Sequence, residues 1–268
     1  MSEAIGILGC GWLGFPLAKT LVQKGYTVKG STTSPAKTAQ LKESGIIPYI
    51  IKLEEDSIEG NPEFFEGLKT IVINVPPGLR GGSSSNYVSK IIQLAKALRT
   101  SGVSQLIFVS STSVYGDLHG EVTEDSVPRP VTASGKQLLE TEGILMEDAH
   151  FKTTVVRFGG LIGPNRHPAS MLSGKMDLKN GEDPVNLIHL DDAIHMIVTI
   201  LEEGYWNDLF NGVYPDHPAK RDYYTSEALK RGLEPPKYVE KSGKIPGKSV
   251  KSRNFLNKKG SFLTPIRS

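Results

Sequence analysis

Short apolar runs recur along the first 160 residues and alternate with segments whose apolar residues have helical spacing. The predicted strands are Ala4–Leu8, Thr27–Lys29, Ile46–Ile51, Thr70–Val75, Gln105–Val109 and Thr153–Arg157. The predicted helices are Phe15–Lys24, Lys37–Ser44, Tyr87–Ser101 and Ser134–Asp148. The strand runs are apolar throughout, which is typical of parallel strands covered on both faces. This alternation predicts an α/β fold with a doubly wound parallel sheet.

The alternation breaks after Gly163. The segment Pro164–Asp183 is rich in Pro, Gly, Asn and Lys and predicts an irregular excursion. Val185–Leu190 and Ala193–Leu201 are predicted to return to a strand and a helix that complete the sheet layer, and Tyr223–Arg231 is predicted as a later helix. We therefore expect a sheet domain formed by residues 1–163 and 182–204, with residues 164–181 and 205–268 in a small lobe.

A glycine-rich turn lies between the first predicted strand and the first predicted helix. The segment Gly9-Cys-Gly-Trp-Leu-Gly14 has GxGxxG spacing. Its glycines permit a tight turn and a close approach of the backbone to a pyrophosphate at the amino end of the helix. A strand–turn–helix context is what a dinucleotide-binding (Rossmann) fingerprint requires. The residues predicted to bind the cofactor here are Gly9, Gly11, Trp12, Leu13 and Gly14.

The segment after the second predicted strand bears on the choice of cofactor. An NAD site places Asp or Glu there for the ribose 2′-hydroxyl, whereas Lys29-Gly-Ser-Thr-Thr-Ser-Pro-Ala-Lys37 contains no carboxylate. Thr33 and Lys37 would accept a 2′-phosphate without repulsion, so NADP is favoured and NAD is the alternative. Val75 and Pro76 are expected under the ribose or nicotinamide, and Gly81–Ser85 is predicted as a flexible loop beyond them.

A hydroxyl-rich segment follows the fifth predicted strand. Leu106–Val109 leads into Ser110-Ser-Thr-Ser-Val-Tyr-Gly116. This pattern resembles the strand-end serine motif of the extended short-chain dehydrogenases/reductases, the superfamily of NAD(P)-dependent epimerases and dehydratases. Val155–Pro164, Val185–Asp192 and Phe210–Tyr214 are similar to later segments of that family. The resemblance covers nearly the whole chain. It implies a Rossmann fold with a C-terminal substrate lobe, and it places Phe158 near the nicotinamide.

The chain departs from the family at the helix that normally carries a Tyr-x-x-x-Lys pair. None of the nine tyrosines has a lysine four residues later. Matching Ser134-Gly-Lys136 to the family's Tyr-Gly-Lys puts Ser134 in place of the tyrosine, and we prefer this alignment because it also matches Glu142 to a glutamate common in the family. The other alignment puts Thr132 there. An aliphatic hydroxyl lacks the accessible anion that a phenol beside a lysine cation provides.

Several side chains remain as candidates for the chemistry. By resemblance, Ser111 takes the place of the substrate-orienting hydroxyl, although Ser110–Ser113 could instead cap the following turn. The candidate proton carriers are Ser134, Tyr115, His167 and His189, and His189 with Asp191 or Asp192 also fits a helix-entry cap. The predicted substrate contacts are Thr112, Arg166 and His167.

Composition narrows the class of protein further. A net charge of +2 argues against a nucleic-acid binder, but residues 217–268 hold 13 Lys and Arg against four acidic residues. A basic lobe of this kind would favour an anionic small-molecule substrate, and the alternative interpretation is a solvated lysine-rich surface. The single cysteine, the absence of a signal-peptide pattern and the absence of an apolar run of about 18 residues predict a cytoplasmic protein without a membrane span. A homodimer would be typical of the resembled family.

Three readings of function stay open at this point. The first is an atypical NADP-binding oxidoreductase or epimerase-like enzyme that acts on a small polar or nucleotide-linked substrate. The second is a non-catalytic NAD(P)-binding sensor or partner protein, suggested by the missing Tyr/Lys pair. The third is a reductase whose chemistry is unrelated to the short-chain family.

Overall fold

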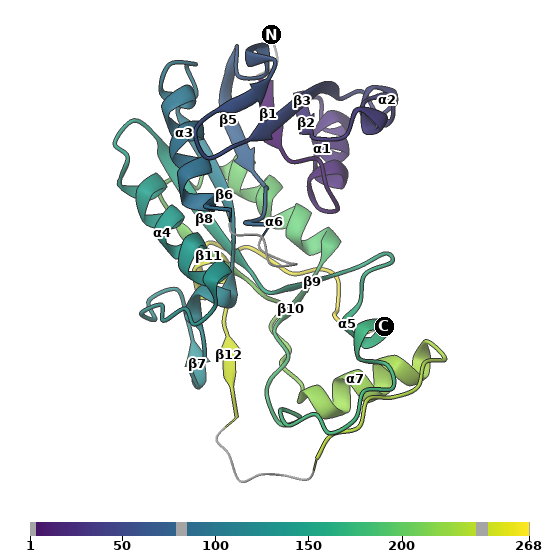
Figure 1. Ribbon diagram of the computed structural model, residues 1–268. Coiled ribbons are helices and arrows are strands. Elements are labelled where there is room, and N and C mark those ends of the chain that lie inside the picture. The colour runs from purple at the N-terminus through teal and green to yellow at the C-terminus, as the bar shows by residue number, and fades with distance from the viewer. Residues whose placement is uncertain (1–3, 79–84, 240–245, 268) are drawn as a thin grey trace.

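An eight-stranded sheet forms the centre of the molecule. The computed structural model describes residues 4–78, 85–239 and 246–267, so the loop predicted at Gly81–Ser85 lies outside them except for Ser85. The strand order is β11-β8-β6-β5-β1-β2-β3-β4 (Figure 1). All neighbours run parallel except β3 and β4. The doubly wound parallel sheet expected from the sequence is therefore confirmed.

The elements of this sheet and its helices follow the predicted alternation. The strands are β1 (Ala4–Leu8), β2 (Thr27–Thr32), β3 (Ile47–Leu53), β4 (Ile58–Gly60), β5 (Leu68–Ile73), β6 (Gln105–Ser111), β8 (Lys152–Phe158) and β11 (Leu209–Gly212). The helices between them are α1 (Gly14–Gln23), α2 (Thr38–Glu43), α3 (Tyr87–Arg99), α4 (Ala133–Glu147) and α6 (Leu190–Glu203). Short 3-10 turns lie at Pro35–Lys37, Pro62–Phe64 and Thr112–Tyr115.

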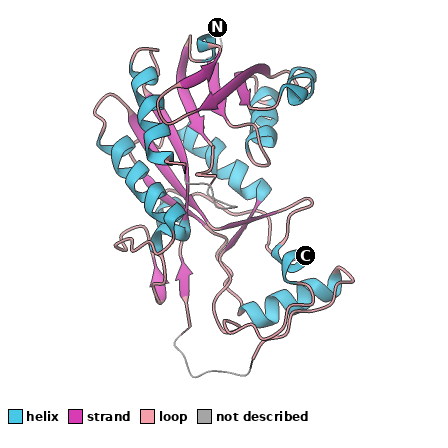
Figure 2. Cartoon of the chain, viewed as in Figure 1, coloured by secondary structure: helices cyan, strands magenta, loops and turns pink. Residues whose placement is uncertain are grey.

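Both faces of the sheet are apolar because both are covered. Ile5 and Ile7 on β1 belong to one core cluster, which also contains buried residues of α1 and α6. Ile71 and Ile73 on β5 belong to a second cluster with residues of α3 and α4. Figure 2 shows the helices on the two sides of the strands. The central strands β1, β5, β6 and β8 are mostly buried on both faces, which explains why their runs in the sequence do not alternate with polar residues.

One predicted strand does not join the main sheet. β10 (Leu187–His189) pairs in parallel with β9 (Gly160–Ile162) in a separate two-stranded sheet. The main sheet is instead completed by β11 beside β8, although residues from 205 onward had been expected in the lobe. The prediction that Val185–Leu190 completes the sheet layer is therefore wrong, because a short apolar run does not specify its pairing partner. The helix that follows it, α6, does cover the sheet as predicted.

The remaining elements lie beyond the carboxyl ends of the strands. α5 (Pro168–Leu172) packs on α7 (Lys220–Lys230) around a small apolar cluster that includes Tyr223 and Ile266. β7 (Gly120–Val122) pairs with β12 (Lys248–Val250), and α8 (Arg253–Asn257) packs on β11. No helix within the described residues has the length and apolar character needed to cross a bilayer. The division into a sheet domain and a lobe stays a prediction.

A charged network is buried at the carboxyl ends of β6 and β8. The Glu142 carboxylate, on α4, accepts from Arg157 Nη2 at 2.6 Å, from Arg157 Nε at 3.1 Å and from Ser110 Oγ at 2.5 Å. Arg157 Nη1 donates to the Tyr115 hydroxyl at 2.9 Å, and that hydroxyl donates to Asn211 Oδ1 at 2.9 Å. The Arg157 and Glu142 side chains are only 5% and 3% exposed. The network therefore ties α4 to β6, β8 and β11 at the edge where ligands bind in such sheets.

We expect Glu142→Ala to lower the free energy of unfolding by about 3–5 kcal/mol, because it leaves the buried Arg157 without its counter-charge. Urea unfolding at neutral pH measures this change. Arg99→Ala is the matched control, since the Arg99 side chain is half exposed and pairs with Asp148 near the surface, where such a pair contributes about 0–1 kcal/mol. A loss in Glu142→Ala no larger than in Arg99→Ala would contradict the structural role of the network.

Candidate cofactor and substrate site

The glycine loop between β1 and α1 is compact enough to exclude side chains at two of its positions. Gly9 has φ of +100°, a region that favours glycine. A Cβ on Gly14 would lie 2.1 Å from the Gly9 carbonyl oxygen. Asn74 Nδ2 donates to that same carbonyl at 3.0 Å, and Gly9 N donates to Ser31 Oγ at 2.9 Å. The ends of β2 and β5 thus hold the turn in the form needed for close approach of a ligand.

A cavity of about 430 Å³ opens beside this loop. Six residues that the sequence assigns to the cofactor line it: Gly9, Gly11, Thr33, Lys37, Val75 and Pro76. The other lining residues are Leu8, Cys10, Ser31, Thr32, Ile51, Lys52, Leu53, Asn74, Pro77, Gly78, Ser85, Tyr87 and Lys90. The cavity therefore lies at the carboxyl ends of β1, β2, β3 and β5, where such sheets bind dinucleotides.

Four predicted cofactor residues do not line this cavity: Trp12, Leu13, Gly14 and Phe158. The side chains of Leu13 and Phe158 are 3% and 2% exposed and pack in the core cluster under α1 and α6. A Cβ on Gly212 would lie 2.3 Å from the Phe158 ring, so this ring fills the core beside β11. The expectation that Phe158 contacts the cofactor does not fit this placement, because its position on β8 turns its side chain toward the interior.

Cations and hydroxyl residues are among the side chains that line the cavity. No carboxylate is found among the described lining residues, which include Lys37, Lys52 and Lys90. Lys52 pairs with Glu54 and Glu59, and Lys90 pairs with Glu54 at 3.5 Å. The sequence reading missed Lys52 and Lys90 because they come from β3 and α3, far along the chain. Their position at the cavity follows only from the way that the sheet brings the strand ends together.

The loop after β5 is held by the first residue of α3. The Tyr87 hydroxyl donates to the Val75 carbonyl at 2.8 Å, and the Tyr87 amide donates to Gln137 Oε1 of α4 at 2.8 Å. Burial raises the pKa of Tyr87 far above its usual range, so this hydroxyl stays neutral. Cys10 in the same cavity is likewise inert, because burial raises the pKa of its thiol to about 12.

The serine motif lies at the end of β6 and enters a 3-10 turn. Ser111 Oγ accepts from Ser113 N at 3.2 Å, so it caps that turn, as the alternative interpretation of the motif predicted. The Ser111 side chain is half-buried and its hydroxyl hydrogen is not used in this bond. Thr112, predicted to contact substrate, is buried. Ser111 and Ser113 are the half-buried members of the motif, whereas Ser110 and Thr112 are buried.

Tyr115 lies inside the molecule and not at the ligand edge. It is fully buried, with the Arg157 guanidinium 4.9 Å from its ring and both hydrogen-bonding directions of its hydroxyl filled by Arg157 and Asn211. Burial raises the pKa of Tyr115, although Arg157 opposes that shift. The expectation that Tyr115 carries a proton is therefore not supported: the 3-10 turn directs it into the core.

The first turn of α4 packs against the serine motif. The Thr132 hydroxyl accepts from Gly135 N at 3.0 Å and so serves as the helix N-cap. A Cβ on Gly135 would lie 2.9 Å from the Ser113 carbonyl oxygen, which shows how closely this turn approaches the end of β6. Ser134, beside Gly135, is half-buried. The structure thus gives Thr132 a capping task and leaves Ser134 next to the motif.

The two candidate histidines both cap helices. His189 Nδ1 accepts from Asp191 N at 3.3 Å at the start of α6, which confirms the helix-entry interpretation. His167 Nδ1 accepts from Ala169 N at 3.1 Å at the start of α5, and its Nε2 lies 3.1 Å from the Tyr223 hydroxyl. The His167 side chain is 7% exposed. The expectation that His167 contacts substrate is not supported, because its two ring nitrogens are engaged by Ala169 and Tyr223.

Arg166 contacts the glycine loop. Its guanidinium lies over the Trp12 ring, 4.8 Å from the ring centre, and Trp12 Nε1 donates to the Pro164 carbonyl at 3.3 Å. Both Arg166 and the neighbouring Pro164 are exposed. The loop after β9 therefore lies directly against the turn that leads into α1.

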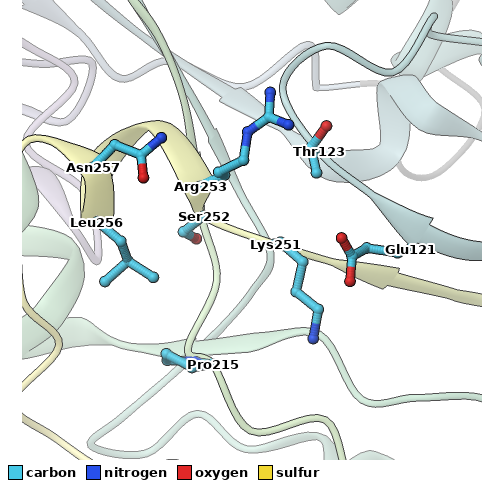
Figure 3. A pocket seen from close by; sticks show the side chains of 8 residues that line it. All are labelled: Glu121, Thr123, Pro215, Lys251, Ser252, Arg253, Leu256 and Asn257. Carbon is cyan, nitrogen blue, oxygen red and sulfur yellow. The ribbon is translucent and has the colours of Figure 1, made fainter.

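A second, smaller cavity of about 240 Å³ lies between β7, α8 and the segment after β11 (Figure 3). Its charged lining residues are Glu121, Lys251 and Arg253, and Arg253 pairs with Asp125. It shares no lining residue with the cavity at the glycine loop. Within the described part of the chain, no group of three His, Cys, Asp or Glu residues is arranged to hold a metal ion.

Residues 5–211 match the NAD dependent epimerase/dehydratase family. Protein YeeZ of Escherichia coli K12 is 33% identical over 260 residues, which cover 96% of this chain and 94% of that protein.

Solved structures show the same fold at lower identity. MoeE5, solved with UDP-glucuronic acid and NAD, has a TM-score of 0.80 at 20% identity, covering 99% of this chain and 95% of that one. UDP-glucuronic acid 4-epimerase from Bacillus cereus, solved with NAD, has a TM-score of 0.79 at 18% identity, covering 98% of this chain and 93% of that one.

We expect the stability of the protein to fall in mild acid partly through His167. Burial, together with Arg231, lowers the pKa of His167 to about 4, below its usual value of 6.5. The unfolded chain therefore binds more protons between these values, so the contribution of His167 is full above about pH 6.5 and is lost as the pH falls toward 4. In His167→Asn, which keeps a capping acceptor, the melting temperature should drop less between pH 7 and pH 5 than in the wild type.

His150→Asn is the control for this measurement, because His150 is exposed on the surface. Its melting temperature should follow the wild-type pH dependence. Identical pH dependence in all three proteins would show that His167 is not buried in its neutral form.

Proposed function

The chain belongs to the NAD-dependent epimerase/dehydratase family, and we propose that it binds NADP and transfers a hydride to or from a small polar or nucleotide-linked substrate. The observation that carries this proposal is the cavity at the glycine loop, lined at the end of β2 by Thr33 and Lys37 without a carboxylate. The solved relatives include proteins with NAD and UDP-sugars bound, which supports a dinucleotide and a nucleotide-linked substrate for this chain.

The preference for NADP rests on charge at one end of the cavity. A 2′-phosphate carries negative charge and several acceptor oxygens, which a lysine and hydroxyl groups can bind. Lys37 ends the 3-10 turn after β2, and Thr33 lies just before that turn. An Asp or Glu here would bind the ribose 2′-hydroxyl of NAD and repel a phosphate, and neither residue lines this part of the cavity.

Ser111 is the residue that we assign to substrate orientation. The bound nicotinamide supplies the hydride chemistry. The Ser111 hydroxyl accepts from Ser113 N, which sets its orientation and leaves its hydrogen to donate to a substrate oxygen. Such a donor stabilises negative charge that develops on that oxygen as a carbonyl carbon gains hydride. Ser134 at the start of α4 is the nearby hydroxyl through which a proton from water reaches the same oxygen.

A non-catalytic NADP-binding protein is the second candidate. It is favoured by the placement of the titratable residues: Tyr115 is part of a buried network, and His167 and His189 cap helices. The Tyr115 hydroxyl and both ring nitrogens of His167 are engaged within the protein, and His189 uses Nδ1 for its cap. This alternative predicts tight binding of NADP without turnover.

A thermal-shift titration with NADPH, NADP⁺, NADH and NAD⁺ tests the cofactor assignment. A ligand at 100 times its Kd stabilises the protein by about 2.7 kcal/mol, which shows as a rise in the melting temperature. We expect Lys37→Ala to raise the Kd of NADP⁺ about tenfold, because one charged contact is lost, and to leave the Kd of NAD⁺ unchanged. Lys42→Ala, an exposed lysine of α2 outside the cavity, is the control. A shift with none of the four nucleotides would rule out the cofactor site.

Replacement of Ser111 distinguishes the hypothesis of an enzyme from the hypothesis of a non-catalytic sensor. With a panel of sugar nucleotides and carbonyl compounds, we expect Ser111→Ala to lower kcat about 100-fold or more, through loss of one donor to the developing oxyanion, while the Kd of NADP⁺ is retained. Ser113→Ala is the control in the same turn. Absence of turnover in the wild type, with NADP bound, would favour the sensor. Full activity of Ser111→Ala would favour a reductase chemistry unrelated to the serine motif.

A further inference from the structure

We propose that Arg166, from the loop after β9, binds the pyrophosphate of the cofactor, so that this loop supplies the positive charge that the glycine loop lacks. The proposal rests on the dinucleotide site proposed above and adds a residue to it. It changes the role expected for Arg166 from the sequence, which was contact with the substrate.

The turn that carries Arg166 is closed by two backbone hydrogen bonds. Gly163 N donates to the Arg166 carbonyl at 3.0 Å, and Arg166 N donates to the Gly163 carbonyl at 3.1 Å, which closes a tight turn with Asn165 at φ of 57°. A Cβ on Gly163 would lie 3.2 Å from the Trp12 ring. The turn is therefore packed against the glycine loop by its backbone, and Arg166 projects from a fixed base.

Trp12 determines where the guanidinium lies. Trp12 follows Gly11 directly, in the turn whose backbone and helix end receive a pyrophosphate in folds of this class. The Arg166 guanidinium lies over the Trp12 ring, 4.8 Å from the ring centre, and the Trp12 indole N–H donates to the Pro164 carbonyl. A guanidinium is planar and carries N–H groups that suit the bidentate binding of phosphate oxygens.

The distribution of charge in the site agrees with this role. Residues 9–14 of the glycine loop carry no charged side chain. The lysines that line the cavity, Lys37, Lys52 and Lys90, come from the turn after β2, from β3 and from α3. Among the described residues, Arg166 is a cation that lies against the glycine turn itself, where two further negative charges of the dinucleotide are expected.

Arg166 also connects the cofactor to the lobe. The next residue, His167, caps α5 and contacts Tyr223 of α7. A phosphate held by Arg166 would therefore stabilise the position of α5 and α7 relative to the glycine loop. This gives NADP binding a means to order the part of the chain expected to hold the substrate.

Binding measurements with three ligands test the proposal. The ligands are NADP⁺, adenosine 2′-monophosphate, which lacks the pyrophosphate, and UDP, which stands for the diphosphate of a nucleotide-linked substrate. We expect Arg166→Ala to raise the Kd of NADP⁺ about 10–100-fold, because a charge-assisted pair of hydrogen bonds is lost. The Kd of adenosine 2′-monophosphate should stay within about twofold. Arg166→Lys, which keeps the charge but not the planar fork, should give an intermediate Kd for NADP⁺.

Two controls make the result specific. Arg99→Ala removes an exposed arginine that pairs with Asp148, away from the site, and should leave all three Kd values unchanged. Lys37→Ala should raise the Kd of both NADP⁺ and adenosine 2′-monophosphate. A Kd that does not change in this variant would contradict the NADP assignment, independently of the result for Arg166. Thermal melting of Arg166→Ala without ligand checks that the fold is retained.

Two outcomes would overturn the proposal. An unchanged Kd of NADP⁺ in a folded Arg166→Ala would show that the guanidinium does not reach the pyrophosphate. A raised Kd for UDP alone would assign Arg166 to a phosphate of the substrate instead.

Discussion

The buried ion pair between Arg157 and Glu142 is the constraint on which the ligand edge of this protein depends. Two charges removed from water are stable only when their hydrogen-bonding groups are filled. Ser110 and Tyr115 fill them here. The same contacts fix α4 against the ends of β6 and β8, and through Asn211 against β11. The positions of Ser111 and Ser134 follow from this arrangement, because each lies next to a segment that the network holds.

The network also explains why the site differs from the usual chemistry of the resembled family. Tyr115 is the tyrosine closest in sequence to the serine motif, and its side chain is buried in the interior. No tyrosine is present at the start of α4. The glycine loop, the hydroxyl residues after β2 and the loop after β5 that Tyr87 holds line one cavity. The candidate residues at the end of β6 and the start of α4 carry aliphatic hydroxyls, which is why cofactor binding and turnover must be measured separately.

Much of the fold could be predicted because its signals are local. Continuous apolar runs identified β1, β5, β6 and β8, since strands covered on both faces need apolar residues on both. The glycine spacing identified the turn before α1, since a Cβ on Gly14 would meet the Gly9 carbonyl oxygen. The partner of Val185–Leu190 could not be predicted in the same way. Its residues are equally suited to the main sheet and to the pair that β10 forms with β9.

The sequence by itself determined the alternation of strands and helices, the glycine turn and the absence of a Tyr-x-x-x-Lys pair, because each is a matter of residue type and spacing. Only the tertiary structure decided which side chains share the site. Lys52 and Lys90 reach the cavity from separate elements, Tyr115 turns inward to Arg157, and Arg166 lies on Trp12 across more than 150 positions of the chain. Such contacts depend on how strand ends and loops meet in space, which the spacing of residues along the chain does not predict.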